Sequence, residues 1–144
     1  MRKFIYLIIL TFGILSCNSD DDNSTIENNC DFISEIISEE DFNAINTSNY
    51  EITEVELNND CLAITFSSSG CGTEFWEENL YSVYAFYTVF PLQRTVKIEL
   101  INNELCLAVF QKSVSFDLTP FQIDRQSELP LNITGWNEQI TYEY

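Results

Sequence analysis

Alternation of apolar and polar side chains, interrupted by asparagine-rich turns, constrains the fold more than any other feature of this sequence. Residues 50–57 alternate with period two, and Asn58, Asn59 and Asp60 separate them from a second apolar run at 61–66. Period-two alternation is typical of a strand with one buried face. Asn and Asp tolerate the left-handed backbone that tight turns require. The pattern therefore predicts a β-hairpin.

The same arrangement recurs later in the chain. Residues 96–100 alternate, Asn102, Asn103 and Glu104 follow, and residues 105–110 form the next apolar run. We expect a second, similar hairpin here and hence an antiparallel sheet.

Several further segments also have the character of strands. The aromatic stretch 81–90 fits a strand buried on both faces, or two strands joined near 82–85. Residues 113–118 predict a strand that ends before Pro120, and 131–134 with 139–144 predict a closing hairpin. Seven or eight short strands predict a mostly β protein, an antiparallel β-sandwich or small barrel.

One segment has helical spacing instead. Between residues 31 and 45, apolar side chains recur at intervals of three and four, with Asp31 placed as an N-cap. We expect one short amphipathic helix before the strands.

The first 16 residues have the features of a removable signal peptide. Arg2 and Lys3 precede an apolar run from residue 4 to 15, which would span about 18 Å as a helix, short of a bilayer core. Ile14-Leu15-Ser16-Cys17 resembles the lipobox of bacterial lipoproteins, which implies lipid attachment at Cys17. We therefore divide the chain into a signal peptide (1–16), a lipidated cysteine with an acidic flexible tether (17–29) and a single β-rich domain (30–144).

The tether carries a second resemblance. Ser19, Asp20, Asp21 and Asp22 follow the lipidated position closely. This Ser/Asp-rich stretch is similar to the surface-export signal of lipoproteins in Bacteroidetes, particularly flavobacteria. The resemblance implies an outer-membrane lipoprotein exposed at the cell surface. A solvated tether that leaves the protein facing the periplasm is the alternative.

The remaining cysteines are even in number. Cys30, Cys61, Cys71 and Cys106 in an exported chain predict two disulfides, with three possible connectivities. We prefer Cys71 with Cys106, because the flanking glycines leave Cys71 free to reach a neighbouring strand. We prefer Cys30 with Cys61, because the helix after Cys30 could cross the Cys61 strand. The spacing lacks the close cysteine pairs of a zinc site, so no metal is expected.

The composition argues against most catalytic and nucleic-acid functions. The chain has no histidine, and its 23 acidic against 6 basic residues disfavour nucleic acid as a partner. Nucleophile and cofactor motifs are missing from the sequence, so we expect neither an enzyme nor a cofactor. Glu74, Glu77 and Glu78 keep a carboxylate-based hydrolase as a remote alternative.

Aromatic residues make a binding surface the more credible function. Exposed Trp and Tyr side chains can stack on sugars or peptides. Trp136 follows Gly135 in a predicted turn and is the best candidate for an exposed anchor, and Trp76 is the second. Both could equally fill a β core.

From residue 30 onward the chain resembles small uncharacterised lipoproteins of flavobacteria. The features that carry this resemblance are Ser-Gly-Cys at 69–71, Glu-Leu-Cys-Leu-Ala at 104–108, and Gly-Trp before the final Thr-Tyr-Glu-Tyr. The group implies no activity, and it supports the Cys71–Cys106 pairing. We expect a non-catalytic binding or interaction module for an extracellular glycan, a peptide or an envelope protein. A structural accessory subunit of an envelope complex is the alternative.

Overall fold

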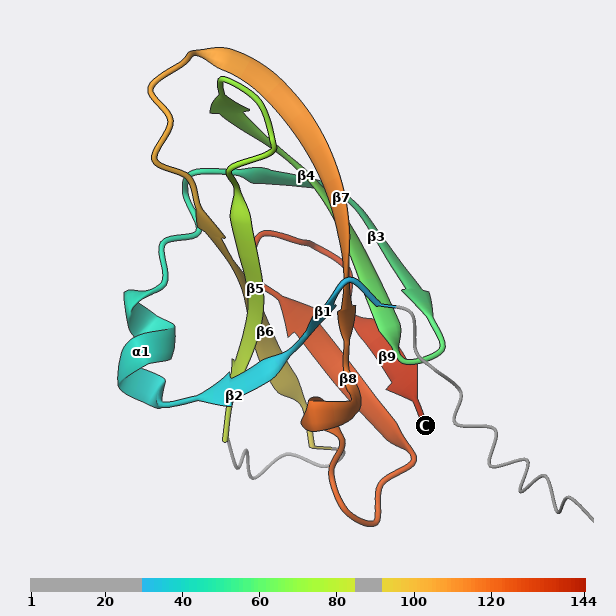
Figure 1. Ribbon diagram of the computed structural model, residues 1–144. Coiled ribbons are helices and arrows are strands. Elements are labelled where there is room, and N and C mark those ends of the chain that lie inside the picture. The colour runs from blue at the N-terminus through green and yellow to red at the C-terminus, as the bar shows by residue number, and fades with distance from the viewer. Residues whose placement is uncertain (1–29, 85–91) are drawn as a thin grey trace, which may run out of the picture.

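Two β-sheets packed face to face form the described part of the protein (Figure 1). The computed structural model describes residues 30–84 and 92–144. The first sheet has the order β1-β7-β4-β3 and the second the order β2-β5-β6-β8-β9. The elements are β1 (Phe32–Ile33), β2 (Glu35–Ile37), α1 (Glu39–Ala44), β3 (Glu51–Asn58), β4 (Cys61–Gly70), β5 (Glu77–Val83), β6 (Arg94–Ile101), β7 (Ala108–Asp117), the 3-10 helix η1 (Thr119–Phe121), β8 (Glu128–Ile133) and β9 (Ile140–Glu143).

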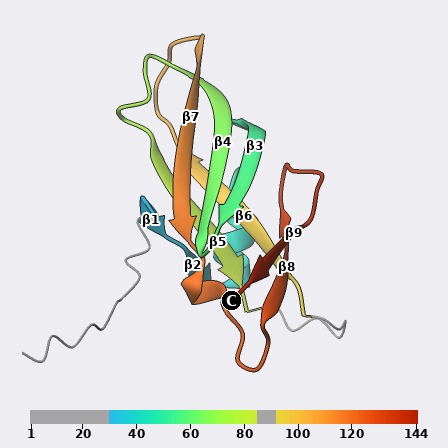
Figure 2. The ribbon, with the colours of Figure 1, turned by 90° about the vertical axis from the view of Figure 1, so that its right-hand side faces the viewer.

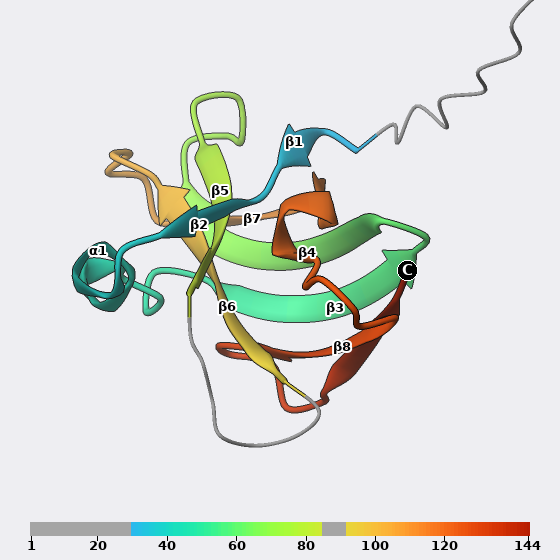
Figure 3. The same cartoon turned by 90° about the horizontal axis from the view of Figure 1, so that it is seen from below.

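The fold is the sandwich that was one of the two predicted β architectures. Neither sheet closes into a barrel, and Figures 2 and 3 show the sheets as separate layers. Within the described residues there are nine strands, slightly more than expected. The sheets are mixed, which corrects the expectation of an antiparallel sheet: β1 with β7, β2 with β5 and β6 with β8 are parallel pairs.

The first and last predicted hairpins are confirmed. β3 pairs antiparallel with β4, and the turn between them places Asn59 at φ 52°, the left-handed conformation expected of asparagine. β8 pairs antiparallel with β9 around Gly135, which has φ 89°.

The second predicted hairpin is wrong. β6 lies in the five-stranded sheet and β7 in the four-stranded sheet, so residues 102–107 cross from one sheet to the other. Alternation predicted β6 correctly, but the runs at 105–110 and 113–118 form the single strand β7, which begins only at Ala108. Alternation also does not specify which strand each one pairs with.

The predicted helix over 31–45 is largely wrong. Residues 32–37 form β1 and β2, one extended segment that pairs first with β7 and then with β5. The helix begins only at Glu39, where the Ser38 side chain accepts a hydrogen bond from Asp41 N at 3.1 Å. Ser38, and not Asp31, is the N-cap. Strand pairing outweighed helical spacing because it satisfies the backbone of this segment at the sheet edges.

The helix α1 packs on the outer face of the five-stranded sheet (Figure 3). Phe42 is buried there, and Lys97 Nζ donates to Phe42 O at 2.8 Å and lies 4.5 Å from the Phe42 ring centroid.

The core lies between the inner faces of the sheets. Alternate residues of the long strands supply it: Leu62, Ile64 and Phe66 from β4, Val96, Ile98 and Leu100 from β6, Val114 and Phe116 from β7, and Leu129, Leu131 and Ile133 from β8. This alternation is the period-two pattern seen in the sequence.

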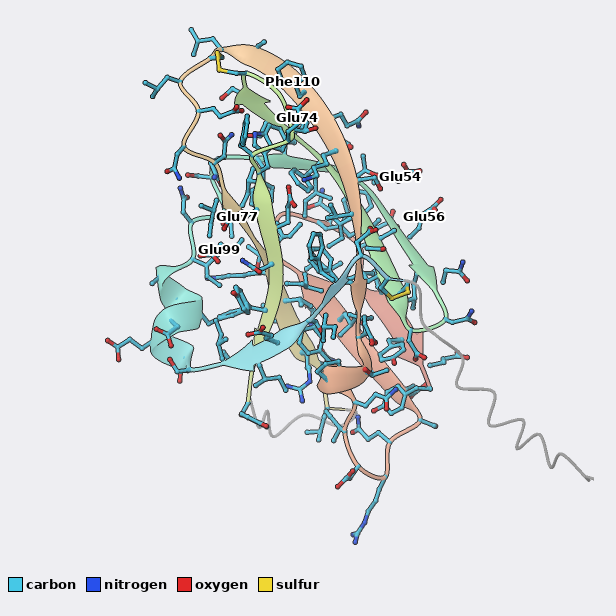
Figure 4. All side chains as sticks on the ribbon, viewed as in Figure 1. Glu54, Glu56, Glu74, Glu77, Glu99 and Phe110 are labelled. Carbon is cyan, nitrogen blue, oxygen red and sulfur yellow. A yellow bond between two sulfur atoms is a disulfide. The ribbon has the colours of Figure 1, made fainter. Side chains whose placement is uncertain are left out.

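The two disulfides are Cys30–Cys61 and Cys71–Cys106, the pairing preferred from the sequence. They lie at opposite ends of β4, where Figure 4 shows the two yellow bonds. The physical reason offered for Cys30 needs correction, because an extended segment and not a helix follows it. Among the residues that the structure describes, no helix is long and apolar enough to cross a membrane.

Candidate functional site

Two loops joined by a disulfide form one end of the sandwich (Figure 1). Residues 71–76 connect β4 to β5, and residues 102–107 connect β6 to β7. The Cys71–Cys106 bond links the loops, which belong to segments 35 residues apart. This end therefore has a defined shape that neither loop would hold alone.

The Glu104 carboxylate holds the same two loops together. Its Oε2 accepts hydrogen bonds from Cys71 N at 2.9 Å, from Gly72 N at 3.4 Å and from Trp76 Nε1 at 3.1 Å. Asn102 also ties the 102–107 loop to the end of β4, because its Nδ2 donates to Ser69 O at 2.7 Å. Hydrogen bonds to an ionised acceptor are stronger than neutral ones, so both loops are firmly positioned.

Four large apolar side chains project from this end into solvent. Leu105 is 94% exposed, Leu107 is 91%, Phe75 is 79% and Val109 is 73%. We call these four residues the apolar tip. Single exposed apolar residues are ordinary, but several on adjoining loops are typical of an interaction surface.

A buried ion pair lies beneath the apolar tip and joins the two sheets. Lys112 Nζ on β7 lies 2.7 Å from Glu78 Oε1 on β5, and the Glu78 side chain is only 1% exposed. Lys112 Nζ also lies 3.4 Å from Thr73 O and 3.5 Å from Trp76 O. The lysine therefore ties β5 and the 71–76 loop to β7.

The three glutamates considered for hydrolysis are not brought together. Glu77 is exposed and Glu78 is buried, because successive strand residues point to opposite faces. Glu74 is exposed on the loop, and Figure 4 shows Glu74 and Glu77 well apart. Within the described residues there is also no group of three or more Cys, Asp or Glu arranged to hold a metal ion.

The tryptophans predicted as binding residues lie inside the fold. Trp76 is 4% exposed, stacks on Phe66 with ring centroids 6.0 Å apart and donates to Glu104. Trp136 is half-buried and packs against the core. Trp76 is therefore not the exposed stacking residue that was predicted, and Trp136 is only partly exposed. Both rings follow the preference of aromatic residues for a β core.

The remaining predicted site residues cannot be placed. Cys17, which is the predicted lipid attachment, and Ser19, Asp20, Asp21 and Asp22, which form the predicted export signal, lie outside the described residues.

Sequence reasoning missed the apolar tip. Leu105, Leu107 and Val109 alternate with Cys106 and Ala108, so the run 105–110 has the pattern of a strand with a buried face. In the structure β7 begins only at Ala108, and the preceding leucines lie on the exposed crossing loop. The signal available in the sequence was Cys106, which lies between the two leucines. A disulfide from Cys106 to Cys71 would hold this segment in a loop.

Comparisons with known proteins establish a likeness of fold. No family model matches the sequence, and no curated protein matches it. Two solved structures are similar, each at 15% identity over 78% of this chain. One is a protein of unknown function, DUF1344, from Bacteroides vulgatus, with a TM-score of 0.51. The other, from Parabacteroides distasonis, is described as "Putative TOXIN related protein" and has a TM-score of 0.53. The matched region spans 54% and 58% of those chains, so this chain corresponds to little more than half of each.

Proposed function

We propose that this protein is a non-catalytic interaction module, anchored in the outer membrane through a lipid on Cys17 and facing the medium, which binds a protein partner through the apolar tip. The observation that carries the proposal is the exposure of Leu105, Leu107 and Phe75 on two cross-linked loops, together with Val109 at the adjoining start of β7. Removing such side chains from water drives most protein association.

The position of the apolar tip in the fold supports this role. The described chain begins at Cys30, which is bonded to Cys61 at the first residue of β4, whereas Cys71 follows the last residue. At 3.3 Å per residue, the ten residues of β4 separate these points by about 30 Å. A module tethered through residues 17–29 can therefore extend its apolar tip away from the membrane.

The way the loops are held favours binding without rearrangement. The disulfide and the three hydrogen bonds accepted by Glu104 fix the loops before any partner arrives. Binding then costs less conformational entropy than ordering free loops would.

The chemistry of the apolar tip favours a protein over a glycan or a lipid surface. Sugars stack best on flat aromatic faces, and Trp76 is buried while Trp136 is half-buried against the core. The formal charge of −17 disfavours anionic lipid. An apolar protein surface with basic residues around it is the complementary partner.

Photo-crosslinking in intact cells tests the apolar tip. A photoreactive residue in place of Leu107 is expected to give a discrete protein adduct, and Leu105→Asp in the same chain is expected to abolish it. Ile33 is the matched control, because it is 69% exposed and lies on β1, away from the apolar tip. Equal adducts from positions 107 and 33, or none at 107, would contradict the proposal.

Protease accessibility tests the proposed location at the cell surface. Intact cells carrying the wild type are expected to lose the domain to external protease. A variant with Ser19, Asp20, Asp21 and Asp22 changed to alanine should be protected, and Cys17→Ala should release the protein from the membrane fraction. If the wild type were protected as well, the protein would instead face the periplasm, as an accessory subunit there would.

A further inference from the structure

The strand β7 has one edge that is only partly paired. On one side it pairs with β4 along its whole length, from Ala108 to Asp117. On the other side β1 pairs with it only at Phe116 and Asp117. Figure 2 shows β1 beside the lower end of the long β7. The upper part of this edge therefore has no strand beside it among the described residues.

Hydrogen bonds at the lower end show which backbone groups face that edge. Ser115 N donates to Asp31 Oδ2 at 2.8 Å, and Asp117 O accepts from Ser34 N at 3.1 Å, both on the side of β1. Successive residues of an antiparallel strand direct their backbone groups alternately to the two sides. The N–H and C=O groups of Val109, Gln111 and Ser113 therefore face the same edge. Within residues 30–84 and 92–144 none of these six groups has a hydrogen-bond partner.

The segment of β1 stops short of these residues for two reasons. The Asp31 side chain already satisfies Ser115 N and Ser115 Oγ. Cys30 is bonded to Cys61 of β4, so the chain is held over the sheet and away from the β7 edge at this point.

The two edges of this sheet differ in their protection. The opposite edge strand, β3, carries exposed Glu51, Glu54 and Glu56 and has a register shift between Ile52 and Glu54. Exposed charges and bulges are the usual devices that prevent an edge from pairing. In β7 the exposed residues Val109, Gln111 and Ser113 are uncharged, and the register with β4 is regular.

We propose that a partner protein adds an extended segment as a strand to the β7 edge at Val109–Ser113, with one end of that segment against the apolar tip. The proposal rests on the interaction role of the apolar tip and names its mode. Main-chain hydrogen bonds to the three residues hold the segment, and contact with the apolar tip selects its side chains. Val109 belongs to both surfaces, which makes them continuous.

The charges near this edge define the chemistry of the segment. Lys112 Nζ lies 3.4 Å from Thr73 O, which brings the loop carrying Glu74 to β7. Glu74 is exposed at the upper end, the end of the sandwich at which Figure 4 shows Phe110 of β7. In the described part of the chain, the one ion pair is Lys112 with Glu78, so the Glu74 carboxylate is free to attract cations. The segment is therefore extended, apolar and basic.

Four synthetic octapeptides of the same length test the proposal against the folded domain by isothermal titration. A peptide of alternating lysine and valine is expected to bind. Alternating glutamate and valine should bind at least about tenfold more weakly, because its charge repels Glu74 and the strongly acidic domain. Alternating lysine and serine should lose the contact with the apolar tip. The lysine–valine peptide with every backbone nitrogen methylated should not bind, because the N–H donors on both of its edges are removed.

A pair of variants at one position locates the binding edge. Gln111→Pro removes an N–H that faces the open edge and leaves the ladder to β4 intact. Gln111→Thr is the matched control, since it also removes the 2.8 Å hydrogen bond from Gln111 Nε2 to Thr53 Oγ1 but keeps the backbone N–H. We expect Gln111→Pro to weaken the lysine–valine peptide at least about tenfold relative to Gln111→Thr. Equal affinities would overturn the edge proposal.

Amide hydrogen exchange provides a measurement on the unaltered protein. The amides of Val109, Gln111 and Ser113 should exchange faster than those of Phe110 and Lys112, and the lysine–valine peptide should slow all three. Fast exchange that persists at saturating peptide would overturn the strand addition, as would the absence of binding.

Leu107→Asp separates the two proposals. Loss of peptide binding in Gln111→Pro but not in Leu107→Asp would contradict the apolar tip and leave the edge standing. The reverse result would contradict the edge alone, and unchanged binding in both variants would contradict both.

Discussion

At the scale of single residues, buried polar groups set the most sensitive positions of the fold. The Glu78–Lys112 pair joins the sheets, and Glu78 Oε2 has no hydrogen-bond partner among the described residues. A buried pair adds little net stability over apolar packing, but removing one partner leaves an uncompensated charge. The pair is therefore a specific constraint on how β5 and β7 align.

Lys112→Met is expected to lower the free energy of unfolding by about 3–5 kcal/mol, because it leaves the buried Glu78 carboxylate without its charge partner. Glu78→Leu combined with Lys112→Met should recover most of this loss. Urea unfolding followed by tryptophan fluorescence measures both. A loss in Lys112→Met within the experimental error of the wild type would show that Glu78 is solvated.

Two tyrosines make stability depend on alkaline pH. Burial raises the pKa of Tyr50 well above its ordinary value of 10.0, and the Tyr50 hydroxyl donates to Ile98 O at 2.8 Å. Burial, and then a hydrogen bond to Asp60, raise the pKa of Tyr142 in the same direction.

Above about pH 10 the unfolded chain loses these protons while the folded protein keeps them, so unfolding becomes more favourable. The free energy of unfolding should therefore be level with respect to these groups up to about pH 9 and fall as the pH rises further. Chemical denaturation between pH 8 and pH 11.5 measures it. Tyr50→Phe should flatten the decline, and an unchanged slope would contradict the assignment to Tyr50.

At the scale of elements, the edges of the sheets decided structures that local pattern left ambiguous. Residues 32–37 have helical spacing, yet they form β1 and β2 because the edges of β7 and β5 offer hydrogen bonds to the whole segment. The loop 102–107 crosses between sheets where a hairpin was expected, and that crossing places Leu105 and Leu107 at the surface.

The two disulfides should contribute similarly to stability and differently to binding. They span 31 and 35 residues, so replacing either pair by serine should lower the free energy of unfolding by about 3–4 kcal/mol. Only Cys71→Ser with Cys106→Ser should also lower the photo-adduct yield at position 107, because of the two disulfides only this one joins the loops of the apolar tip. Equal adduct loss in Cys30→Ser with Cys61→Ser would contradict this division.

At the scale of the whole molecule, a large negative charge surrounds a small apolar end. The formal charge of −17 keeps copies of the protein apart. The apolar tip favours association. Repulsion is long-ranged and screened by salt, whereas apolar contact is not weakened by salt.

Self-association should therefore increase with ionic strength. Sedimentation velocity is expected to show a monomer at low salt and a rising fraction of dimer in sodium sulfate. Leu105→Asp with Leu107→Asp should stay monomeric throughout, while Ile33→Asp should behave as the wild type. Dimerisation of the double variant would place the association outside the apolar tip.

The sequence by itself determined the β-rich class, the hairpins at 51–70 and 128–143, and a preferred disulfide pairing. Each depends on neighbours in the chain or on the parity of cysteines: alternation, turn residues and flexible loops are local properties. The lipid anchor and the cell-surface location are likewise predicted from a local stretch of sequence, residues 1–22, and they remain predictions.

Only the tertiary structure decided the sheet of each strand, the strands at 32–37, the burial of Trp76 and the exposure of the apolar tip. All four depend on which segments meet across the sandwich, and period-two alternation is the same whichever strand lies alongside. Leu105 and Leu107 are the clearest example of what alternation in the sequence leaves undecided. Their pattern matches the core-facing residues of β4, yet they are exposed because the chain crosses between sheets before β7 begins.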